Sequence, residues 1–241
     1  MKTEKPARRA VLAGCAVAIV LAASVLWPAI DLRVAGWFYV PDKGFPLGDT
    51  YFFDALHTLA YAGARILGLA LAMLVIFAAS QRAPVLGLGS KEWLFLFVGL
   101  IIGPGLIANG LLKDHWGRAR PREVTEFGGN MEFSRALLPS EECQHNCSFV
   151  SGDGAFGFYL PAFAYVLPRP RARRTFWGAM GVGCLFAVSR IAAGAHFLSD
   201  NLFAAFFMQA VLALLHAVMF GARETRNCWR NWLFIADKST D

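Results

Sequence analysis

Basic side chains gather in the segment LLKDHWGRARPRE, residues 111–123, which directly follows an apolar run. Its cations are Lys113, Arg118, Arg120 and Arg122. An ammonium group can hold an anion as a point charge, and a guanidinium fork can donate two parallel hydrogen bonds to phosphate oxygens. Because basic residues at a membrane surface also anchor anionic lipid headgroups, this segment alone gives weak support for a reaction site.

A second polar segment, SFVSGDGAF at residues 148–156, begins the next apolar run. Ser151 can cap a helix that starts there, and Gly152 lets a ligand approach the backbone closely. The free N–H groups at the start of a helix bind anions, although a plain serine cap would use the same residues. Asp153 is unusual because it places a carboxylate at the edge of a hydrophobic segment.

The third polar segment, SRIAAGAHFLSD at residues 189–200, contains Arg190, His196 and Asp200. The histidine and the aspartate have an i,i+4 spacing, so a helix would place them on one face. A carboxylate that accepts a hydrogen bond from one imidazole nitrogen leaves the other nitrogen free to react. A surface His–Asp pair is common, but an arginine at the same membrane depth favours a functional site.

Together, these three segments supply the groups that phosphoryl transfer requires. The reaction needs positive charge on the equatorial oxygens, an in-line nucleophile and a proton for the leaving oxygen. Lysine and arginine can bind the oxygens, and histidine can attack the phosphorus. No obvious set of metal ligands accompanies them, so the sequence predicts a reaction without a metal or another cofactor.

The composition of the chain predicts that a membrane holds these segments in place. Hydrophobic residues make up 56% of its 241 residues and charged residues 17%, whereas soluble domains carry about a quarter charged residues. About 20 apolar residues cross a bilayer as a helix. We therefore expect an all-α bundle of six membrane-spanning helices, the first of them uncleaved, near residues 10–30, 58–79, 92–112, 153–168, 176–194 and 201–220.

The placement of basic residues predicts the orientation in the membrane. They cluster before the first span, around the loop between the second and third spans, before the fifth span and in the tail: Lys2, Lys5, Arg8, Arg9, Arg82, Lys91, Arg169, Arg171, Arg173, Arg174, Arg223, Arg226, Arg230 and Lys238. With six spans all of them lie on one face, which the positive-inside rule assigns to the cytoplasm together with both termini. The three polar segments then face the periplasm. This placement explains the net charge of +6 better than nucleic-acid binding does.

Two further features leave alternatives open. Cys143 and Cys147 lie in the expected outer loop, where an oxidising periplasm favours a disulfide over two free thiols, although the sequence does not fix the connectivity. Arg65 lies within the second expected span. Its charge either faces a partner or water, or reaches the membrane surface along its own flexible stem.

In order and spacing, the three segments resemble the motifs of the type 2 phosphatidic acid phosphatase (PAP2) superfamily, which shares its site with vanadium haloperoxidases. The family pattern is Lys-x6-Arg-Pro, then Pro-Ser-Gly-His, then Ser-Arg-x5-His-x3-Asp. The first and third motifs are matched by Lys113, Arg120 and Pro121, and by Ser189, Arg190, His196 and Asp200. The resemblance covers residues 104–200. Because the sequence resembles the membrane branch of the family, we expect residues 1–241 to form a single membrane domain.

The resemblance also implies roles for these residues. It implies that phosphate oxygens are bound by Lys113, Arg120, Arg190, Ser151 and the N–H of Gly152. It implies that His196 is the nucleophile, that the resulting phosphohistidine is hydrolysed by water, and that Asp200 orients His196. Relatives of this kind dephosphorylate lipids of the bacterial cytoplasmic membrane without a metal, so phosphatidic acid, phosphatidylglycerophosphate, undecaprenyl diphosphate and lipid A are the candidate substrates.

The second motif departs from the family pattern at Asp153, which stands where the family has the histidine expected to protonate the leaving group. A free aspartic acid is mostly ionised at neutral pH and is a poor acid there. Desolvation favours its neutral form, whereas nearby cations and the helix dipole favour its charged form. We expect Asp153 to act as an acid only when a phosphate dianion is bound, with His115 and His145 as substitute donors.

Two other functions are compatible with the same motifs. A phosphotransferase would pass the phosphoryl group from the histidine to a second lipid instead of to water. A non-catalytic protein would use the polar cluster to bind or transport lipid headgroups, but such a protein does not need the His–Asp pair. Hydrolysis of a phosphoric monoester or diphosphate on a membrane lipid is therefore the expected activity.

Overall fold

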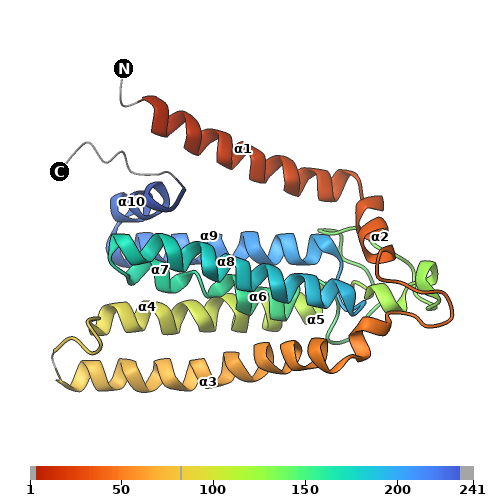
Figure 1. The fold of residues 1–241 in the computed structure, drawn as a ribbon, viewed down its shortest axis with the longest axis horizontal. Helices are drawn as coiled ribbons and strands as arrows, with labels where there is room; N and C mark the ends of the chain where they lie inside the picture. Colours follow the sequence, from red (N-terminus) through yellow and green to blue (C-terminus); the bar gives the residue numbers. More distant parts are fainter. Residues whose placement is uncertain (1–3, 82, 234–241) are drawn as a thin grey trace.

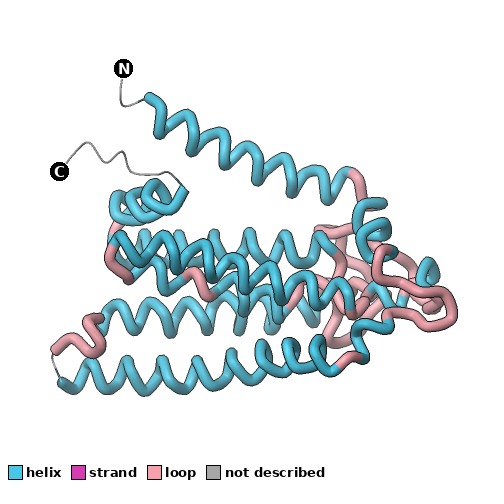
Figure 2. Tube along the Cα trace, in the orientation of Figure 1, coloured by secondary structure: helices cyan, strands magenta, loops and turns pink. Residues whose placement is uncertain are grey.

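The computed structural model describes residues 4–81 and 83–233, which form helices joined by loops, with isolated bridges but no β-strand among them (Figures 1 and 2). Lys2, Arg82 and Lys238 of the expected charge pattern, and both chain ends, lie outside these residues. The helices are α1 (Glu4–Leu26), α2 (Ala29–Gly36), η1 (Pro46–Asp49), α3 (Tyr51–Gln81), α4 (Ser90–Leu100), the π-helix η2 (Ile101–Leu112), α5 (Lys113–His115), η3 (Pro121–Glu123), η4 (Thr125–Phe127), α6 (Gly152–Tyr159), α7 (Ala162–Val166), α8 (Arg169–Ala192), α9 (Leu198–Phe220) and α10 (Ala222–Leu233).

Four helical segments are long and apolar enough to cross a membrane. They are α3, the continuous run α4–η2–α5 at Ser90–His115, α8 and α9. A fifth is obtained if Gly14–Leu26 and α2, which meet at a bend of 88°, count as one span. The described residues thus confirm an all-helical protein with four to five candidate spans, and the count of six stays a prediction.

The segment expected as the fourth span differs most from the sequence-based prediction. Residues 153–168 form parts of two short helices, α6 and α7, instead of one long helix. Pro161 lies at the break, where its missing N–H cannot continue the backbone ladder of α6. Pro168 lies directly before α8 and separates it from α7.

Helix α6 packs closely against α8 and α9 and also contacts α3 and η2. A Cβ atom on Gly157 of α6 would lie 2.7 Å from the Cα of Gly183 in α8, so only glycine permits this approach of the two backbones. Around this contact lie buried side chains such as Ala155, Phe158 and Phe203. The tight packing fixes the N-terminal end of α6 relative to α8 and α9.

The loops divide between the two ends of the bundle (Figure 1). The α3–α4 loop, the start of α8 and helix α10 lie at one end. Helix α2, the long loop at residues 116–151 and the α8–α9 loop lie at the other. This division agrees with the two loop sets inferred from charge, although which end faces the cytoplasm stays a prediction.

Candidate active site

His196 lies at the loop-rich end, between α8 and α9, and is 3% exposed. Its Nδ1 lies 2.6 Å from the carbonyl oxygen of Ser148. Because a carbonyl can only accept, Nδ1 carries the proton and Nε2 keeps its lone pair. Burial, then the charges of the neighbouring Lys and Arg side chains, lowers the pKa of His196 well below its usual range. The imidazole is therefore neutral and has the tautomer that a nucleophile requires.

Asp200 supports His196 through Ser148 and makes no direct hydrogen bond to it. The carboxylate oxygen is 3.9 Å from Nδ1 of His196, but it accepts from the Ser148 hydroxyl at 2.5 Å and from the Phe197 N–H at 2.7 Å. The i,i+4 spacing does not place the two side chains on one helical face, because α9 begins at Leu198 and His196 lies outside the helix that contains Asp200. Asp200 thus fixes Ser148, whose carbonyl in turn fixes the imidazole.

Arg118 is a structural residue although it belongs to the basic segment. Its guanidinium pairs with Asp200, with Asp31 at 2.8 Å and with the Ser199 hydroxyl at 2.8 Å. The side chains of Arg118, Asp31 and Asp200 are all fully buried. Asp31 was not predicted from the sequence, because it lies 87 residues before its partner Arg118. This network joins α2 and the long loop to α9 and is not available to a ligand.

The other predicted cations have fewer ion-pair partners than Arg118. The guanidinium of Arg120 donates to the Asn146 carbonyl, at 3.2 Å from Nε and 2.5 Å from Nη2. A carbonyl carries no charge, and no carboxylate pairs with Arg120 among the described residues. Among the described residues, Lys113 has no carboxylate within 4.0 Å, and the buried Nε of Arg190 makes no hydrogen bond. That Nε faces Asp153 Oδ2 at 3.3 Å, a charge contact without hydrogen-bond alignment. Three cations near one carboxylate favour the binding of an anion.

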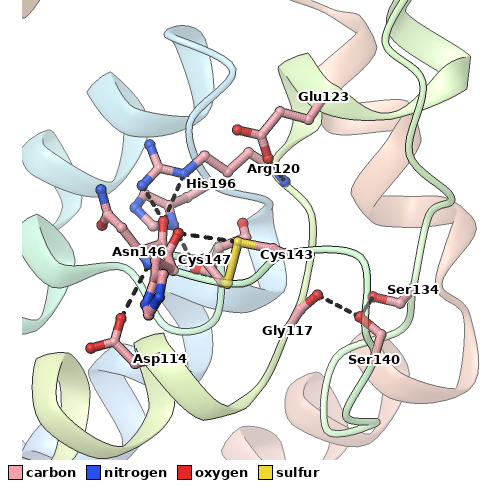
Figure 3. The surroundings of a disulfide bond; sticks show 12 residues. Asp114, Gly117, Arg120, Glu123, Ser134, Ser140, Cys143, Asn146, Cys147 and His196 are labelled. Carbon is pink, nitrogen blue, oxygen red and sulfur yellow. Dashed lines mark hydrogen bonds between the residues drawn. A yellow bond between two sulfur atoms is a disulfide. The ribbon is translucent and has the colours of Figure 1, made fainter.

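A disulfide joins Cys143 and Cys147 in the part of the long loop that lies beside Arg120, with a Cα–Cα distance of 5.6 Å (Figure 3). The loop is tied down beside it, because Cys147 N–H donates to the Lys113 carbonyl at 3.0 Å and Asn146 N–H to the Asp114 carboxylate at 3.1 Å. These bonds direct the Asn146 carbonyl toward Arg120 (Figure 3). The sequence-based expectation of a disulfide at this position is confirmed.

Ser151 and Gly152 form the start of α6. The Ser151 hydroxyl accepts from the Gly154 N–H at 3.1 Å, which is the N-cap geometry expected for this residue. A Cβ atom on Gly152 would lie 2.8 Å from Asn109 Oδ1 and 3.3 Å from Lys113 Nζ. The missing side chain therefore lets the Lys113 ammonium group lie against the N-terminal turn of α6.

Asp153 has a partner that the sequence did not indicate. Its Oδ2 lies 2.7 Å from Nδ1 of His57, a residue of α3 that is 96 positions earlier in the chain. Of the histidines considered as substitute donors, His115 is exposed and bonds to the Leu111 carbonyl at 3.0 Å. A one-residue contact between two helices leaves no pattern in a single sequence, so His57 could not be assigned to the site.

A cavity of about 1040 Å³ leads from this polar cluster along the groove between α3 and α4–η2. The polar end of the cavity is lined by His57, Asn109, Lys113, Asp114, Asn146, Gly152 and Asp153. The apolar part is lined by residues that include Ala64, Leu69, Ala72, Phe97, Leu100, Ile101 and Phe156. Arg65 also lines it, with its guanidinium 3.3 Å from the centre of the Tyr61 ring and no carboxylate within 4.0 Å among the described residues. The cavity thus joins a polar end, which contains Lys113 and the start of α6, to an apolar groove.

The comparisons with known proteins agree with this site. Residues 92–224 match the model of the PAP2 superfamily, and the chain belongs to that family. It is 32% identical over 210 residues to a lipid A 4'-phosphatase of Francisella tularensis subsp. novicida, covering 83% of this chain and 90% of the relative. It is 28% identical over 214 residues to a lipid A 4'-phosphatase of Rhizobium leguminosarum, covering 83% and 92%. No solved structure gives a significant match to the chain.

Family membership, the matching relatives and the apolar helices together make the protein a multi-pass membrane lipid phosphatase, which hydrolyses phosphoric monoesters. Both relatives extend over most of this chain, so the similarity is not limited to the three motifs. Among the described residues, no group of three or more His, Cys, Asp or Glu side chains is placed to hold a metal ion.

Substitution of Gly152 by alanine is expected to lower kcat/KM about 10- to 100-fold with little loss of stability. The added methyl group displaces the ends of the Lys113 and Asn109 side chains, not the backbone, so it disturbs phosphate positioning more than folding. Phosphate release and thermal unfolding in detergent measure the two effects. Gly178→Ala is the matched control, because no atom lies within 4 Å of its added Cβ. Wild-type kcat/KM in Gly152→Ala would contradict this role.

Proposed function

We propose that the protein removes the 4'-phosphate of lipid A at the periplasmic face of the bacterial inner membrane. The observation that carries the proposal is a cavity that joins Lys113 and the start of α6 to an apolar groove between α3 and α4–η2. A lipid headgroup phosphate would bind at the end that contains Lys113, and its acyl chains would lie in the apolar groove. The relatives are lipid A 4'-phosphatases, which favours lipid A among the candidate lipid phosphates.

In the proposed reaction, His196 Nε2 attacks the phosphorus while Lys113, Arg120, Arg190, Ser151 and the N–H of Gly152 bind the phosphate oxygens. The neutral tautomer of His196 supports this role, since its Nδ1 proton is held by the Ser148 carbonyl. Asp200 maintains that geometry through the Ser148 hydroxyl. The P–N bond of the phosphohistidine is then broken by water, which releases inorganic phosphate.

The proposed orientation places the site on the periplasmic side and both termini in the cytoplasm. It is supported by the Cys143–Cys147 bond beside the site, because disulfides persist in oxidising compartments. It is also supported by the basic residues at the start of α8 and in α10, which lie at the opposite end of the bundle. Cysteine labelling of intact cells, with a single cysteine introduced at Leu138, tests the orientation: a membrane-impermeant reagent should label it.

The substrate is tested by phosphate release from purified protein in detergent. The substrates are lipid A, phosphatidylglycerophosphate, phosphatidic acid and undecaprenyl diphosphate, each supplied alone so that no second lipid can accept the phosphoryl group. We expect the highest kcat/KM with lipid A and, by tandem mass spectrometry, loss of the 4'-phosphate. A higher kcat/KM on another lipid would replace the proposed substrate, and phosphate transfer without release would indicate a phosphotransferase.

A further inference from the structure

We propose that His57 donates the proton to the leaving oxygen and that Asp153 positions His57 for this step. The proposal rests on the phosphohistidine mechanism above and adds the acid that this mechanism needs. His57 belongs to α3, outside the three motif segments, so the motifs do not assign it to the reaction. In the fold, its side chain contacts Asp153, which stands where the family motif has the proton-donating histidine.

The hydrogen bond between the two side chains leaves one imidazole nitrogen available. Nδ1 of His57 donates to Asp153 Oδ2 at 2.7 Å, and among the described residues Nε2 makes no hydrogen bond. The His57 side chain is 42% exposed and lines the cavity, whereas that of Asp153 is 13% exposed. One nitrogen is thus held by a largely buried carboxylate, and the imidazole is open to the cavity through which the substrate and protons arrive.

Asp153 is arranged as an acceptor and not as the acid itself. Its Oδ2 faces both Nδ1 of His57 and Nε of Arg190, at 2.7 and 3.3 Å. An ionised carboxylate can only accept a hydrogen bond, and here Oδ2 accepts from Nδ1 of His57 while the charge of Arg190 lies beside it. This changes the role expected from the sequence, in which Asp153 was the acid, to that of a positioning residue.

The positions of the two histidines relative to the cavity fit an in-line displacement. His196 is buried and is not among the residues that line the cavity, whereas His57 lines it. The lipid part of the substrate, and with it the leaving oxygen, occupies the cavity side. The nucleophile therefore attacks from the buried side while His57 lies on the side of the leaving group.

The proton and electron pairs balance over the two steps. In the first, the Nε2 lone pair of His196 forms the P–N bond, the bond from phosphorus to the lipid oxygen breaks, and that oxygen takes the Nε2 proton of cationic His57. In the second, water forms a bond to phosphorus, neutral His57 takes a proton from that water, and the P–N electron pair returns to His196. His57 and His196 end in their starting states.

The test is the dependence of kcat/KM on the leaving group in His57→Gln. We expect a loss of about 10²- to 10⁴-fold on the alkyl phosphate of the lipid, whose leaving oxygen needs a proton. On p-nitrophenyl phosphate, whose leaving group is stable as an anion, the loss should be less than about 10-fold. Equal losses on both substrates, or no loss on the lipid, would overturn the proposal.

Further variants separate this proposal from the function on which it rests. Loss of activity on both substrates in His196→Asn but not in the control His115→Gln would support the proposed mechanism independently of His57. Full activity in His196→Asn would remove that mechanism and the role of His57 with it. Orthovanadate affinity, measured in every variant, should stay near the wild-type value in His57→Gln, because the phosphate-binding groups are intact; a large loss of affinity would assign His57 to binding instead.

The role of Asp153 is tested by rescue. Asp153→Ala should show the same leaving-group dependence as His57→Gln, because the imidazole loses its orienting partner. The double variant His57→Gln/Asp153→His places an imidazole at the position that holds it in the family motif, and we expect it to recover at least 10-fold of the lipid activity lost in His57→Gln. The positioning role would be contradicted by either of two results: no recovery in the double variant, or wild-type kcat/KM in Asp153→Ala.

Discussion

Substitution of His196 by asparagine is expected to lower turnover of the lipid phosphate on the order of 10⁴-fold or more, because it removes the proposed attacking nitrogen. Asparagine can keep a hydrogen bond to the Ser148 carbonyl, which normally accepts from Nδ1. The packing around this buried position should therefore change little. The reaction is measured as phosphate release from lipid A in detergent micelles.

The same variant tests the covalent intermediate. After rapid mixing with lipid that contains labelled phosphate, wild-type protein quenched in base should carry label that is stable in base and released by acid. His196→Asn should carry none, whereas His115→Asn should be labelled as the wild type is, since His115 is exposed and contacts only the Leu111 carbonyl. Label that persists in His196→Asn would assign the nucleophile to another residue.

Substitution of Arg118 by methionine is expected to have the largest effect on stability. It would leave Asp31 and Asp200 fully buried without their cation. Removal of one partner from a buried ion pair typically costs about 3–5 kcal/mol, mostly from the uncompensated charge that remains. We expect a loss of this size in the free energy of unfolding, measured by denaturation in mixed micelles.

A matched control separates the network from the charge alone. Arg135→Met removes an arginine from the same loop, but Arg135 is exposed and its side chain has no ion-pair partner among the described residues. Its free energy of unfolding should change by less than about 0.5 kcal/mol. Similar values for the two variants would show that the buried network does not stabilise α2 against α9.

Hydropathy predicted the helices because the length and apolar character of a spanning helix are local properties. The runs at 92–112 and 201–220 correspond to Ser90–His115 and to α9 within a few residues. The second run was too short, because α3 begins at Tyr51 and continues through polar residues before the apolar stretch. That extra helix contains His57, whose contact with Asp153 joins two segments that are 96 residues apart in the sequence.

The site was predictable where its residues lie in one motif and unpredictable where they meet across the fold. The motifs that resemble the PAP2 pattern predicted Lys113, Arg120, Arg190 and His196, and the structure brings these four side chains to the same end of the bundle. The contacts of Asp31 with Arg118, and of His57 with Asp153, join distant segments and leave no periodic signal. The structural role of Arg118 rests on the same kind of long-range contact, with Asp31 and Asp200.

The groove between α3 and α4–η2 determines the direction from which a lipid substrate reaches the site. Tyr61, Leu69 and Ile101 line the cavity and are each about half exposed or more, so the groove opens sideways to the surrounding lipid. Encounter then takes place by diffusion in two dimensions. In micelles, turnover should follow the mole fraction of substrate in the detergent and fall on dilution with neutral detergent, even at constant bulk concentration. Such surface dilution would show that the enzyme meets its substrate within the lipid phase.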